Sequence, residues 1–271
     1  MTEIPVLIDI DTRSGVGRLT LNRPKLHNAF DEIAIARVTE AVELLDRDDQ
    51  VRVIVIAGNG KSFSAGGDLN WMRRMADFTP EENEADGRRL AAMFQAIDLA
   101  RKPTVARVHG NAFAGATGII SACDIAVAAE GTVFSLSEVR LGLVPATISP
   151  YVIRAIGERH ARRILLTAER FGAAEALRMG LVHMVVPEAE LDAAVDRVIA
   201  DLLAGATSSQ GRAKELIRFV ASRPIDEGVI AETARCIAAA RASLEGREGL
   251  AAFFAKREPT WRTKLPSAKK S

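Results

Sequence analysis

The stretch KPTVARVHGNAFAGATGIISACD, residues 102–124, decides the fold that we expect for this chain. Pro103 opens a short apolar run at residues 104–108, and such a run between turn signals is typical of a buried strand. Small side chains dominate residues 112–118, and the apolar residues Ile119, Ile120 and Ala122 follow at the spacing of a packed helix. Small side chains let a ligand approach the backbone, and the first N–H groups of a helix stabilise anions. We therefore predict a strand, a turn that can hold an oxyanion, and a buried helix.

A second stretch, residues 51–69, repeats this plan. Its apolar residues 51–57 predict another strand, and Gly58-Asn59-Gly60 predicts a turn. The segment SFSAGGDL at residues 62–69 is again small and Gly-rich, and a helix is expected to begin near Asp68. If the two turns meet, their backbone N–H groups form a paired donor site. Taken alone, either turn is explained equally well by close packing of a helix on a strand.

Hydrophobic patterning predicts further strands and helices on both sides of these stretches. The expected strands are residues 6–11, 18–21, 125–129, 134–136 and 181–186. The expected helices of this part are residues 33–45, 90–97, 149–157, 158–166 and 173–179. After residue 188 only helices are predicted, at 191–203, 211–221, 225–244 and 249–256. Because these last helices have no obvious core of their own, we divide the chain into a core, residues 1–195, and a helical region, residues 196–271.

The composition argues against several classes of function. Lys and Arg total 36 and Asp and Glu total 35, so a net charge of +1 gives no electrostatic case for binding nucleic acid or a membrane surface. No apolar run approaches the ~18 residues of a membrane span, and the N-terminus lacks the pattern of a signal peptide. The two cysteines and four scattered histidines form no disulfide or metal pattern. We expect a cytoplasmic protein without a metal site.

Four motifs carry a resemblance to a known family. They are FSAGGDL at residues 63–69, VHGNAFAGATGIISACDI at 108–125, SEVRLGLVP at 137–145 and FGAAEALRMGLV at 171–182. In order and spacing they resemble the signatures of the enoyl-CoA hydratase/isomerase (crotonase) family. The resemblance implies an α/β fold in which repeated β-β-α units form a spiral of two near-perpendicular sheets. It also implies that the helical region 196–271 makes the contacts of a homotrimer, and that two trimers stack as a homohexamer.

The resemblance further implies a site for an acyl-CoA thioester, with coenzyme A as part of the substrate and no separate cofactor. The thioester oxygen is expected between the backbone N–H groups of Ala65 and Gly115, and Glu138 is expected to transfer the proton. The residues expected to contact coenzyme A are Lys25, Asn28, Ala29, Ala65, Gly66, Gly67, Asp68, Leu69, Gly115, Phe253 and Lys256. Two of these have ordinary alternative explanations, since Lys25 is also typical of a solvated surface and the Asp68 side chain of a helix N-cap.

The sequence departs from the family at one catalytic position. Hydratases of the family typically use two glutamates, and this chain has Glu138 at one position but Gly118 at the other. Three functions therefore remain open. The first is an enoyl-CoA hydratase of a branch that lacks the first glutamate, helped by a carboxylate from the acidic residues 77–86. The second is a Δ3,Δ2-enoyl-CoA isomerase, for which one base suffices, and the third is a CoA-thioester-binding protein without catalysis.

One further similarity concerns the substrate. SEVRLGLVPA at residues 137–146 resembles branches of the family that hydrate methylglutaconyl-CoA in leucine breakdown. Such a substrate has a second carboxylate, for which an arginine is the natural partner. The candidate partners are Arg73, Arg74, Arg88, Arg89 and Arg140, each of a type that is more often found on the surface.

Overall fold

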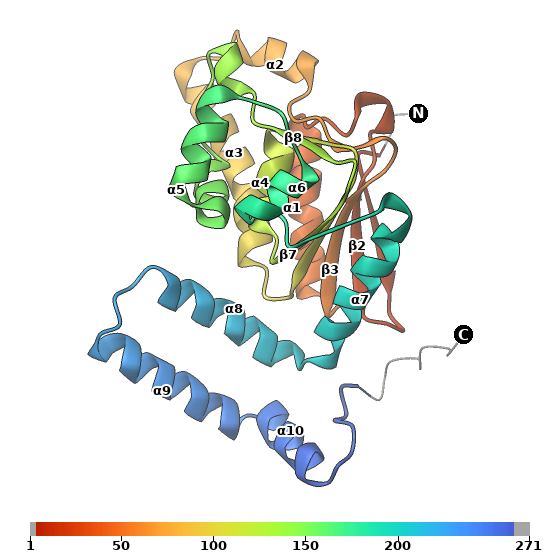
Figure 1. The fold of residues 1–271 in the computed structure, drawn as a ribbon, viewed down its shortest axis with the longest axis vertical. Coiled ribbons are helices and arrows are strands. Elements are labelled where there is room, and N and C mark those ends of the chain that lie inside the picture. Colours follow the sequence, from red (N-terminus) through yellow and green to blue (C-terminus); the bar gives the residue numbers. More distant parts are fainter. Residues whose placement is uncertain (1–3, 263–271) are drawn as a thin grey trace.

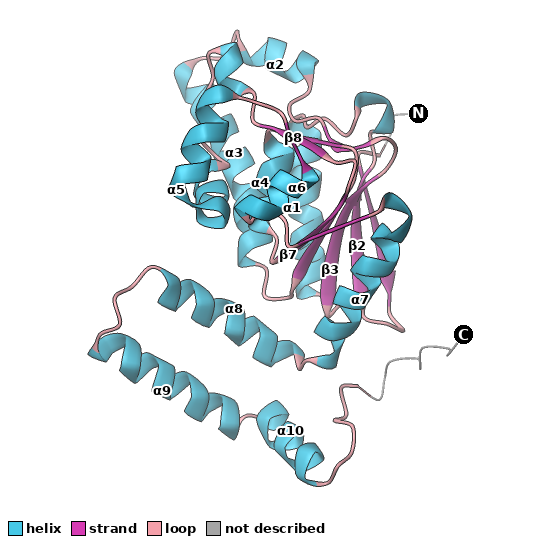
Figure 2. Ribbon diagram, viewed as in Figure 1, coloured by secondary structure: helices cyan, strands magenta, loops and turns pink. Residues whose placement is uncertain are grey.

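Two β-sheets form the centre of the computed structural model, which describes residues 4–262 (Figures 1 and 2). The larger sheet has the strand order β1-β2-β3-β5-β7-β10, and the smaller one has the order β4-β6-β8-β9. In the large sheet β1 and β2 pair antiparallel through the predicted hairpin, and the pairings from β2 to β10 are parallel. The strands are β1 (Val6–Asp11), β2 (Val16–Leu21), β3 (Val53–Gly58), β4 (Ser62–Ser64), β5 (Thr104–Val108), β6 (Asn111–Phe113), β7 (Ile125–Ala129), β8 (Val133–Ser135), β9 (Phe171–Gly172) and β10 (Met184–Val186).

The strands alternate between the two sheets along the chain. Strands β3, β5 and β7 lie in the large sheet, and each is followed at once by a strand of the small sheet, β4, β6 or β8. A helix follows each pair of strands, which confirms the predicted β-β-α repeat. This arrangement matters for function because the short strands β4 and β6 pair in parallel, so the two Gly-rich turns that follow them emerge at the same edge.

Helices cover the sheets and form the C-terminal part of the chain (Figure 2). Three of them begin at a side-chain N-cap, since Asp31, Asp68 and Thr79 each accept a backbone N–H of the helix that they precede. The α-helices are α1 (Glu32–Arg47), α2 (Leu69–Met75), α3 (Pro80–Leu99), α4 (Gly115–Ala122), α5 (Ser149–Thr167), α6 (Ala173–Met179), α7 (Leu191–Ala204), α8 (Thr207–Ala221), α9 (Glu227–Ala242) and α10 (Leu244–Phe254). Three 3-10 helices are η1 (Pro24–Leu26), η2 (Glu138–Leu141) and η3 (Glu188–Glu190).

Strands β3, β5 and β7 of the large sheet are buried on both faces, which explains their continuous apolar runs. One face packs with α1, α3, α4 and α5 in the main core, where Ile54, Ile56 and Phe94 are fully buried. The opposite face presents Val53, Val55 and other valines to α7. Among the described helices, none is long and apolar enough to cross a membrane.

Helix α7 belongs to the core, although the predicted boundary at residues 195 and 196 falls inside it. Its apolar face packs on the large sheet through Leu191, Ala194, Val195, Ile199 and Leu203. The chain leaves the sheet only at Gly205, and α8, α9 and α10 then form a separate layer at one end of the molecule (Figure 1). The structural boundary of the helical region therefore lies about ten residues later than the sequence predicted.

Two helices that the sequence predicted separately are joined in the structure. Residues 149–157 and 158–166 form the single element α5, which bends at Gly157, where φ is 73° and ψ is 158°. Its N-cap is Ile148, whose side chain makes no capping hydrogen bond. The left-handed conformation of Gly157 explains why a glycine stands at the bend.

Candidate active site

The two Gly-rich turns touch each other. A Cβ placed on Gly66 would lie 2.9 Å from the Cβ of Ala114 and 3.2 Å from the carbonyl oxygen of Phe113. Gly66 also has a φ of 90°, which a residue with a side chain rarely adopts. Glycine is therefore required at position 66 for both space and conformation, and it lets the turn after β4 contact the turn after β6.

The first turn offers a free N–H group at Gly67 rather than at the predicted Ala65. The N–H of Ala65 donates to the carbonyl oxygen of His27 at 2.9 Å, so it is not available to a ligand. The N–H groups on either side of Gly67 are also used, by the Ser64 hydroxyl for Gly66 and by the Phe30 carbonyl oxygen for Asp68. Within residues 4–262, the N–H of Gly67 has no acceptor. The assignment of Ala65 as a donor is therefore corrected.

The second turn delivers a free N–H group at Gly115, as the sequence predicted. Gly115 is the first residue of α4, and its N–H finds no acceptor in the part of the chain that the structure describes. The preceding Ala114 has a φ of 50° and a ψ of −117°, a conformation that typically costs a residue with a Cβ about 1–3 kcal/mol. Its N–H donates to the Ser135 carbonyl oxygen at 2.8 Å, which helps to hold this turn.

Phe30 connects the two donors. Its backbone forms a parallel bridge opposite Gly67, and its ring lies 3.5 Å from the position of a Cβ on Gly115. The ring is 2% exposed. The two free N–H groups thus belong to turns that pack on one another and share a buried aromatic residue, which leaves little freedom for either donor to move.

Asn28 and Asp68 hold the surrounding loops with their side chains. The Asn28 amide nitrogen donates to the carbonyl oxygens of Asn59, Ser62 and Phe63, and its oxygen accepts the N–H of Arg23. Asp68 accepts the N–H groups of Asn70 and Trp71 as the N-cap of α2 and pairs with Arg23 at 3.0 Å. Burial works to raise the pKa of Asp68, but these hydrogen bonds and the guanidinium hold it below its usual value. The alternative explanation of the Asp68 side chain as a helix cap is confirmed.

Glu138 has a buried carboxyl oxygen with no partner. It is the first residue of η2, just after β8, and its Oε2 accepts no hydrogen bond from any described residue. Burial raises the pKa of Glu138 above its usual value. A native structure rarely leaves a buried carboxyl oxygen unsatisfied, and a carboxyl group in such a setting is a candidate general acid or base.

Gly118 leaves no space for a second carboxyl group. A Cβ placed on it would lie 2.4 Å from Cγ2 of Ile148 and 2.8 Å from Cε1 of Phe94. Ile148 and Phe94 are both buried in the main core. The sequence indicated the missing glutamate, but nothing in it indicated that these two side chains occupy the space.

The candidate arginines differ in how strongly they are already bound. Arg74 pairs with Glu32, Arg88 with Glu84, and Arg89 with Asp86. Asp86, the partner of Arg89, is the one buried residue of the acidic segment 77–86. Among residues 4–262, Arg73 and Arg140 each make a single hydrogen bond of 3.4 Å, to the Asn70 side chain and to the Thr167 carbonyl oxygen, respectively. Those two remain the arginines with the most capacity for a further partner.

The remaining predicted contacts lie in different places. Lys25 and Leu69 are exposed near the two turns, while Ala29 is buried beside Phe30. Phe253 and Lys256 are exposed at the end of α10, and Figure 1 places α10 at the opposite end of the molecule from α2. Within one chain, Phe253 and Lys256 therefore do not join the two turns.

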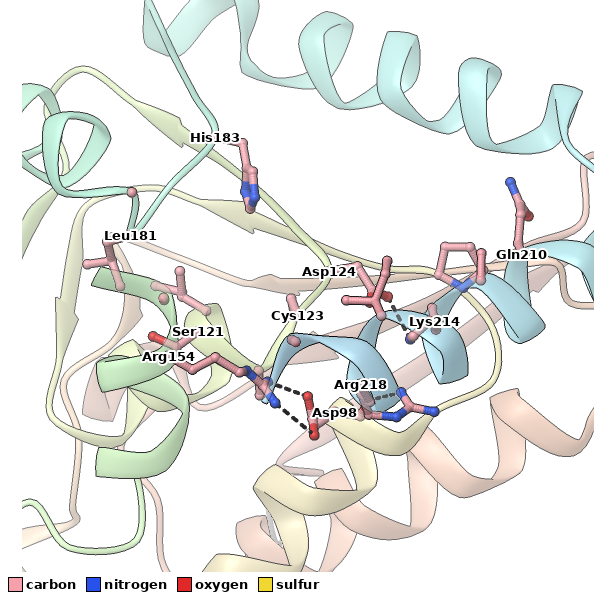
Figure 3. Close-up of a pocket in the computed structure, with 18 of the residues that line it drawn as sticks. Asp98, Ser121, Cys123, Asp124, Arg154, Leu181, His183, Gln210, Lys214 and Arg218 are labelled. Carbon is pink, nitrogen blue, oxygen red and sulfur yellow. Dashed lines mark hydrogen bonds and ion pairs between the residues drawn. The ribbon is translucent and has the colours of Figure 1, made fainter. Parts of the chain in front are cut away.

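A separate groove of about 770 Å³ lies between the core and α8 (Figure 3). Lys214 of α8 binds Asp124 at 2.6 Å, and Arg154 pairs with Asp98 on the core side. Burial raises the pKa of the Cys123 thiol in this groove, so that thiol is not an activated nucleophile. No cluster of three or more potential metal ligands occurs among residues 4–262. The groove contains none of the predicted site residues and is a junction between the core and the helical layer.

Comparison with known proteins gives a consistent picture. The sequence profile of the enoyl-CoA hydratase/isomerase family matches residues 11–264. The crystal structure of an enoyl-CoA hydratase from Shewanella pealeana is 43% identical, with a TM-score of 0.92 and coverage of 95% of this chain and 96% of that one. Crotonyl-CoA hydratase of Syntrophomonas wolfei is 30% identical over 91% of this chain and 94% of its own length. Trans-2-decenoyl-[acyl-carrier-protein] isomerase of Streptococcus mutans is 33% identical over 78% of this chain and 81% of its own length.

Proposed function

This chain belongs to the enoyl-CoA hydratase/isomerase family, and we propose that it is a hydratase that adds water across the α,β double bond of an acyl-CoA thioester. The observation that carries the proposal is the buried, unpartnered Oε2 of Glu138 in a fold that also holds two free backbone N–H groups in touching turns. A general base and an oxyanion site are the two elements that this reaction needs.

In this proposal the thioester oxygen accepts hydrogen bonds from the N–H groups of Gly67 and Gly115. When water attacks the β-carbon, the electrons of the double bond move toward the thioester and its oxygen becomes negative. Two fixed donors then stabilise the enolate, and removing one such donor in comparable sites costs about 2.7–4 kcal/mol. Gly67 takes the place of Ala65 because the Ala65 N–H is already used by His27.

Glu138 transfers the proton in both halves of the reaction. Its carboxylate accepts a proton from water as the water oxygen bonds to the β-carbon. The protonated carboxyl group then returns that proton to the α-carbon as the enolate collapses to the thioester. One carboxyl group suffices for this cycle, and its raised pKa makes it a stronger base than an exposed glutamate.

Glu138→Gln tests the hydratase proposal directly. Glutamine keeps the size of the side chain but cannot accept and return the proton, so turnover of an enoyl thioester should fall by ~10²–10⁴-fold. The affinity for the saturated thioester should change little, because the proposed donors Gly67 and Gly115 are backbone groups. Loss of the enoyl absorbance measures turnover. Near wild-type turnover of the variant would mean that a group other than Glu138 transfers the proton.

An isomerase is the second candidate, and the packing around Gly118 favours it. With Ile148 and Phe94 in the space of the second carboxyl group, a single base remains, and one base can move a proton between two carbons. The Streptococcus mutans relative is named as an isomerase. Gain of enoyl absorbance from a 3-enoyl-CoA, without hydration of a 2-enoyl-CoA, would favour isomerisation. Binding of both thioesters without turnover of either would identify the chain as a binding protein without catalysis.

For the substrate we propose methylglutaconyl-CoA. The proposal is supported by the similarity of residues 137–146 to that branch of the family, and by the weak hydrogen bonds that Arg73 and Arg140 make. Either guanidinium has capacity to bind a second carboxylate. A turnover panel of acyl-CoA thioesters tests this, since a carboxylated thioester should exceed its uncharged analogue in kcat/KM, and Arg73→Gln or Arg140→Gln should remove the difference.

A further inference from the structure

The groove between the core and α8 contains polar groups that no described residue uses. Ser121 of α4 lines it and is 8% exposed, and its hydroxyl is buried without a hydrogen-bond partner among residues 4–262. His183 lines the same groove (Figure 3), and its Nδ1 accepts the N–H of Ala126 at 3.1 Å. The proton of the neutral imidazole therefore lies on Nε2, for which the described residues provide no acceptor. Because a native structure rarely leaves a buried hydroxyl unpaired, a ligand oxygen is the partner that these donors suit.

The lining of this groove has an excess of positive charge. Its cations are Arg154, Lys214 and Arg218, and its carboxylates are Asp98 and Asp124. Lys214 pairs with Asp124, and Arg154 pairs with Asp98. Among residues 4–262, the half-buried Arg218 donates to one acceptor, the backbone carbonyl oxygen of Asp98 at 3.1 Å, and no carboxylate pairs with it. The charge of one guanidinium is thus uncompensated, and a guanidinium binds a carboxylate through two N–H groups at once.

Apolar side chains form much of the remaining lining. They include Ile120 and Leu181 on the core side and Ile217 on α8. Ile217 is 65% exposed, so a ligand that covers it removes apolar surface from water. The groove volume of about 770 Å³ is in the range of small-molecule sites, which combine apolar walls with a few polar groups. An anion with an apolar body therefore matches the lining better than an inorganic anion does.

We propose that this groove is a binding site for a small aliphatic carboxylate. The carboxylate accepts a hydrogen bond from the Ser121 hydroxyl and compensates the charge of Arg218, and the aliphatic chain lies against Ile217. A single negative charge on the ligand matches the single uncompensated cation of the lining. Neither Glu138 nor the two Gly-rich turns line this groove, so the proposal does not depend on the proposed hydratase function.

Titration calorimetry with hexanoate tests the site, with saturating butanoyl-CoA present to occupy the proposed thioester site. Hexanoate should bind saturably, and butanoate should bind about tenfold more weakly, because each buried CH₂ group contributes about fourfold in affinity. Hexanol and inorganic phosphate should each bind at least about tenfold more weakly than hexanoate, since the first lacks the charge and the second lacks the chain.

Two variants with matched controls locate the site. Ser121→Ala and Arg218→Gln should each lower the affinity for hexanoate about tenfold or more, which is the effect of losing a hydrogen bond to a charged group. Ser222→Ala is the control for the serine, because Ser222 lines the same groove but is exposed. Arg212→Gln is the control for the arginine, because Arg212 is exposed on the same helix and does not line this groove. Both controls should keep the wild-type affinity.

Thermal unfolding separates a binding role of Ser121 from a structural one. Because its hydroxyl has no partner among the described residues, Ser121→Ala should leave Tm unchanged or raise it, whereas a structural hydroxyl would lower Tm on removal. The proposal is overturned by a lack of saturable hexanoate binding, by equal affinity for hexanol or phosphate, or by wild-type affinity in either Ser121→Ala or Arg218→Gln. Displacement of hexanoate by butanoyl-CoA would also overturn it, since it would assign the binding to the thioester site.

Discussion

At the scale of single residues, the site depends on which polar atoms the fold leaves unused. Most backbone N–H groups around the first turn already donate hydrogen bonds, including that of Ala65. Among the described residues of this turn, the free N–H belongs to Gly67. Among the side chains, Glu138 likewise has an unused polar atom, because its Oε2 is buried without a partner among the described residues. A buried polar atom left unpaired costs stability, so these atoms are where a ligand gains most by binding.

The pH dependence of activity should follow the ionisation of Glu138. Burial raises its pKa, and the base is active only when deprotonated, so kcat/KM should fall as the pH drops through a value above the usual 4.5 of a glutamate. A pH–rate profile measures this midpoint. A profile that stays flat down to pH 4.5 would contradict the assignment of Glu138 as the base.

The same group should lower the stability of the folded protein at neutral pH. Since the folded-state pKa of Glu138 is above the unfolded value, the folded protein loses stability as the pH rises from the unfolded pKa to the folded one. Glu138→Gln removes that loss. Thermal unfolding should therefore show a higher Tm for the variant at pH 7.5, with a smaller difference at pH 4, and the opposite trend would contradict the buried state of the carboxyl group.

Gly118→Glu should destabilise the protein and should not improve hydration. The new Cβ would overlap Ile148 and Phe94, and overpacking of a buried site typically costs about 1–3 kcal/mol. Gly131→Glu is the matched control, because a Cβ on Gly131 has no heavy atom within 4 Å among the described residues. Chemical denaturation measures the free energy of unfolding of the two variants. Equal values would show that the Ile148 and Phe94 side chains move aside at little cost.

At the scale of elements, α10 is attached to α8 through one carboxylate. Glu245, in the first turn of α10, accepts the N–H groups of Ser208 and Ser209 at 3.1 and 3.0 Å, and both serine hydroxyls. Burial works to raise the pKa of Glu245, but these hydrogen bonds hold it below the usual value. A carboxylate at a helix N-terminus is stabilised by its free N–H groups and its dipole. The contact therefore sets how α10 is oriented on α8.

Glu245→Ala should loosen α10 without affecting the core. Loss of a helix-capping contact typically costs about 1 kcal/mol, so the amides of α10 should exchange with solvent several times faster in hydrogen-exchange experiments. Glu227→Ala, in the first turn of the neighbouring helix α9, serves as the control because its side chain has no hydrogen bond within residues 4–262. Unchanged exchange in α10 after Glu245→Ala would mean that other contacts hold the helix.

Arg52 attaches the start of the helical layer to the large sheet. Its guanidinium donates to the carbonyl oxygens of Leu203, Gly205 and Trp261 and to the Thr207 hydroxyl. Burial lowers the pKa of Arg52, yet arginine remains charged at any physiological pH. The end of α7 and the start of α8 are therefore joined to the sheet by a half-buried cation, which the sequence pattern alone does not reveal.

At the scale of the whole molecule, the helical layer exposes many large apolar side chains. Ile225, Leu244, Phe253 and Phe254 are each at least three-quarters exposed in the single chain. Apolar surface of this kind usually marks a contact with another protein. We propose that it is covered by further copies of the chain, in the homotrimer or homohexamer that the family resemblance of the sequence implies. A neighbouring copy would also bring Phe253 and Lys256 to a site that they do not reach within one chain.

Sedimentation should therefore find a trimer or a hexamer at micromolar concentration. Replacing Phe253 and Phe254 together by serine should shift the distribution toward smaller species and raise KM for the thioester. Arg197→Ser, an exposed change on α7, should leave the assembly intact. A stable monomer of the wild-type protein would contradict the proposal.

Taken by itself, the sequence pattern predicted the strands of the large sheet and most of the helices, and the β-β-α repeat was implied by the family resemblance. Residues 102–124 predicted a strand and a buried helix, and these are β5 and α4, because local apolar patterning and small residues are read directly from the chain. The short strand β6 opens the segment for which only a turn was predicted. The N-cap at Asp68 was equally local. What only the tertiary structure decided was how distant segments meet: His27 uses the N–H of Ala65, and Ile148 and Phe94 fill the space beside Gly118. These contacts join residues that are 24 or more positions apart in the chain, and hydrophobic periodicity contains no information about such pairs.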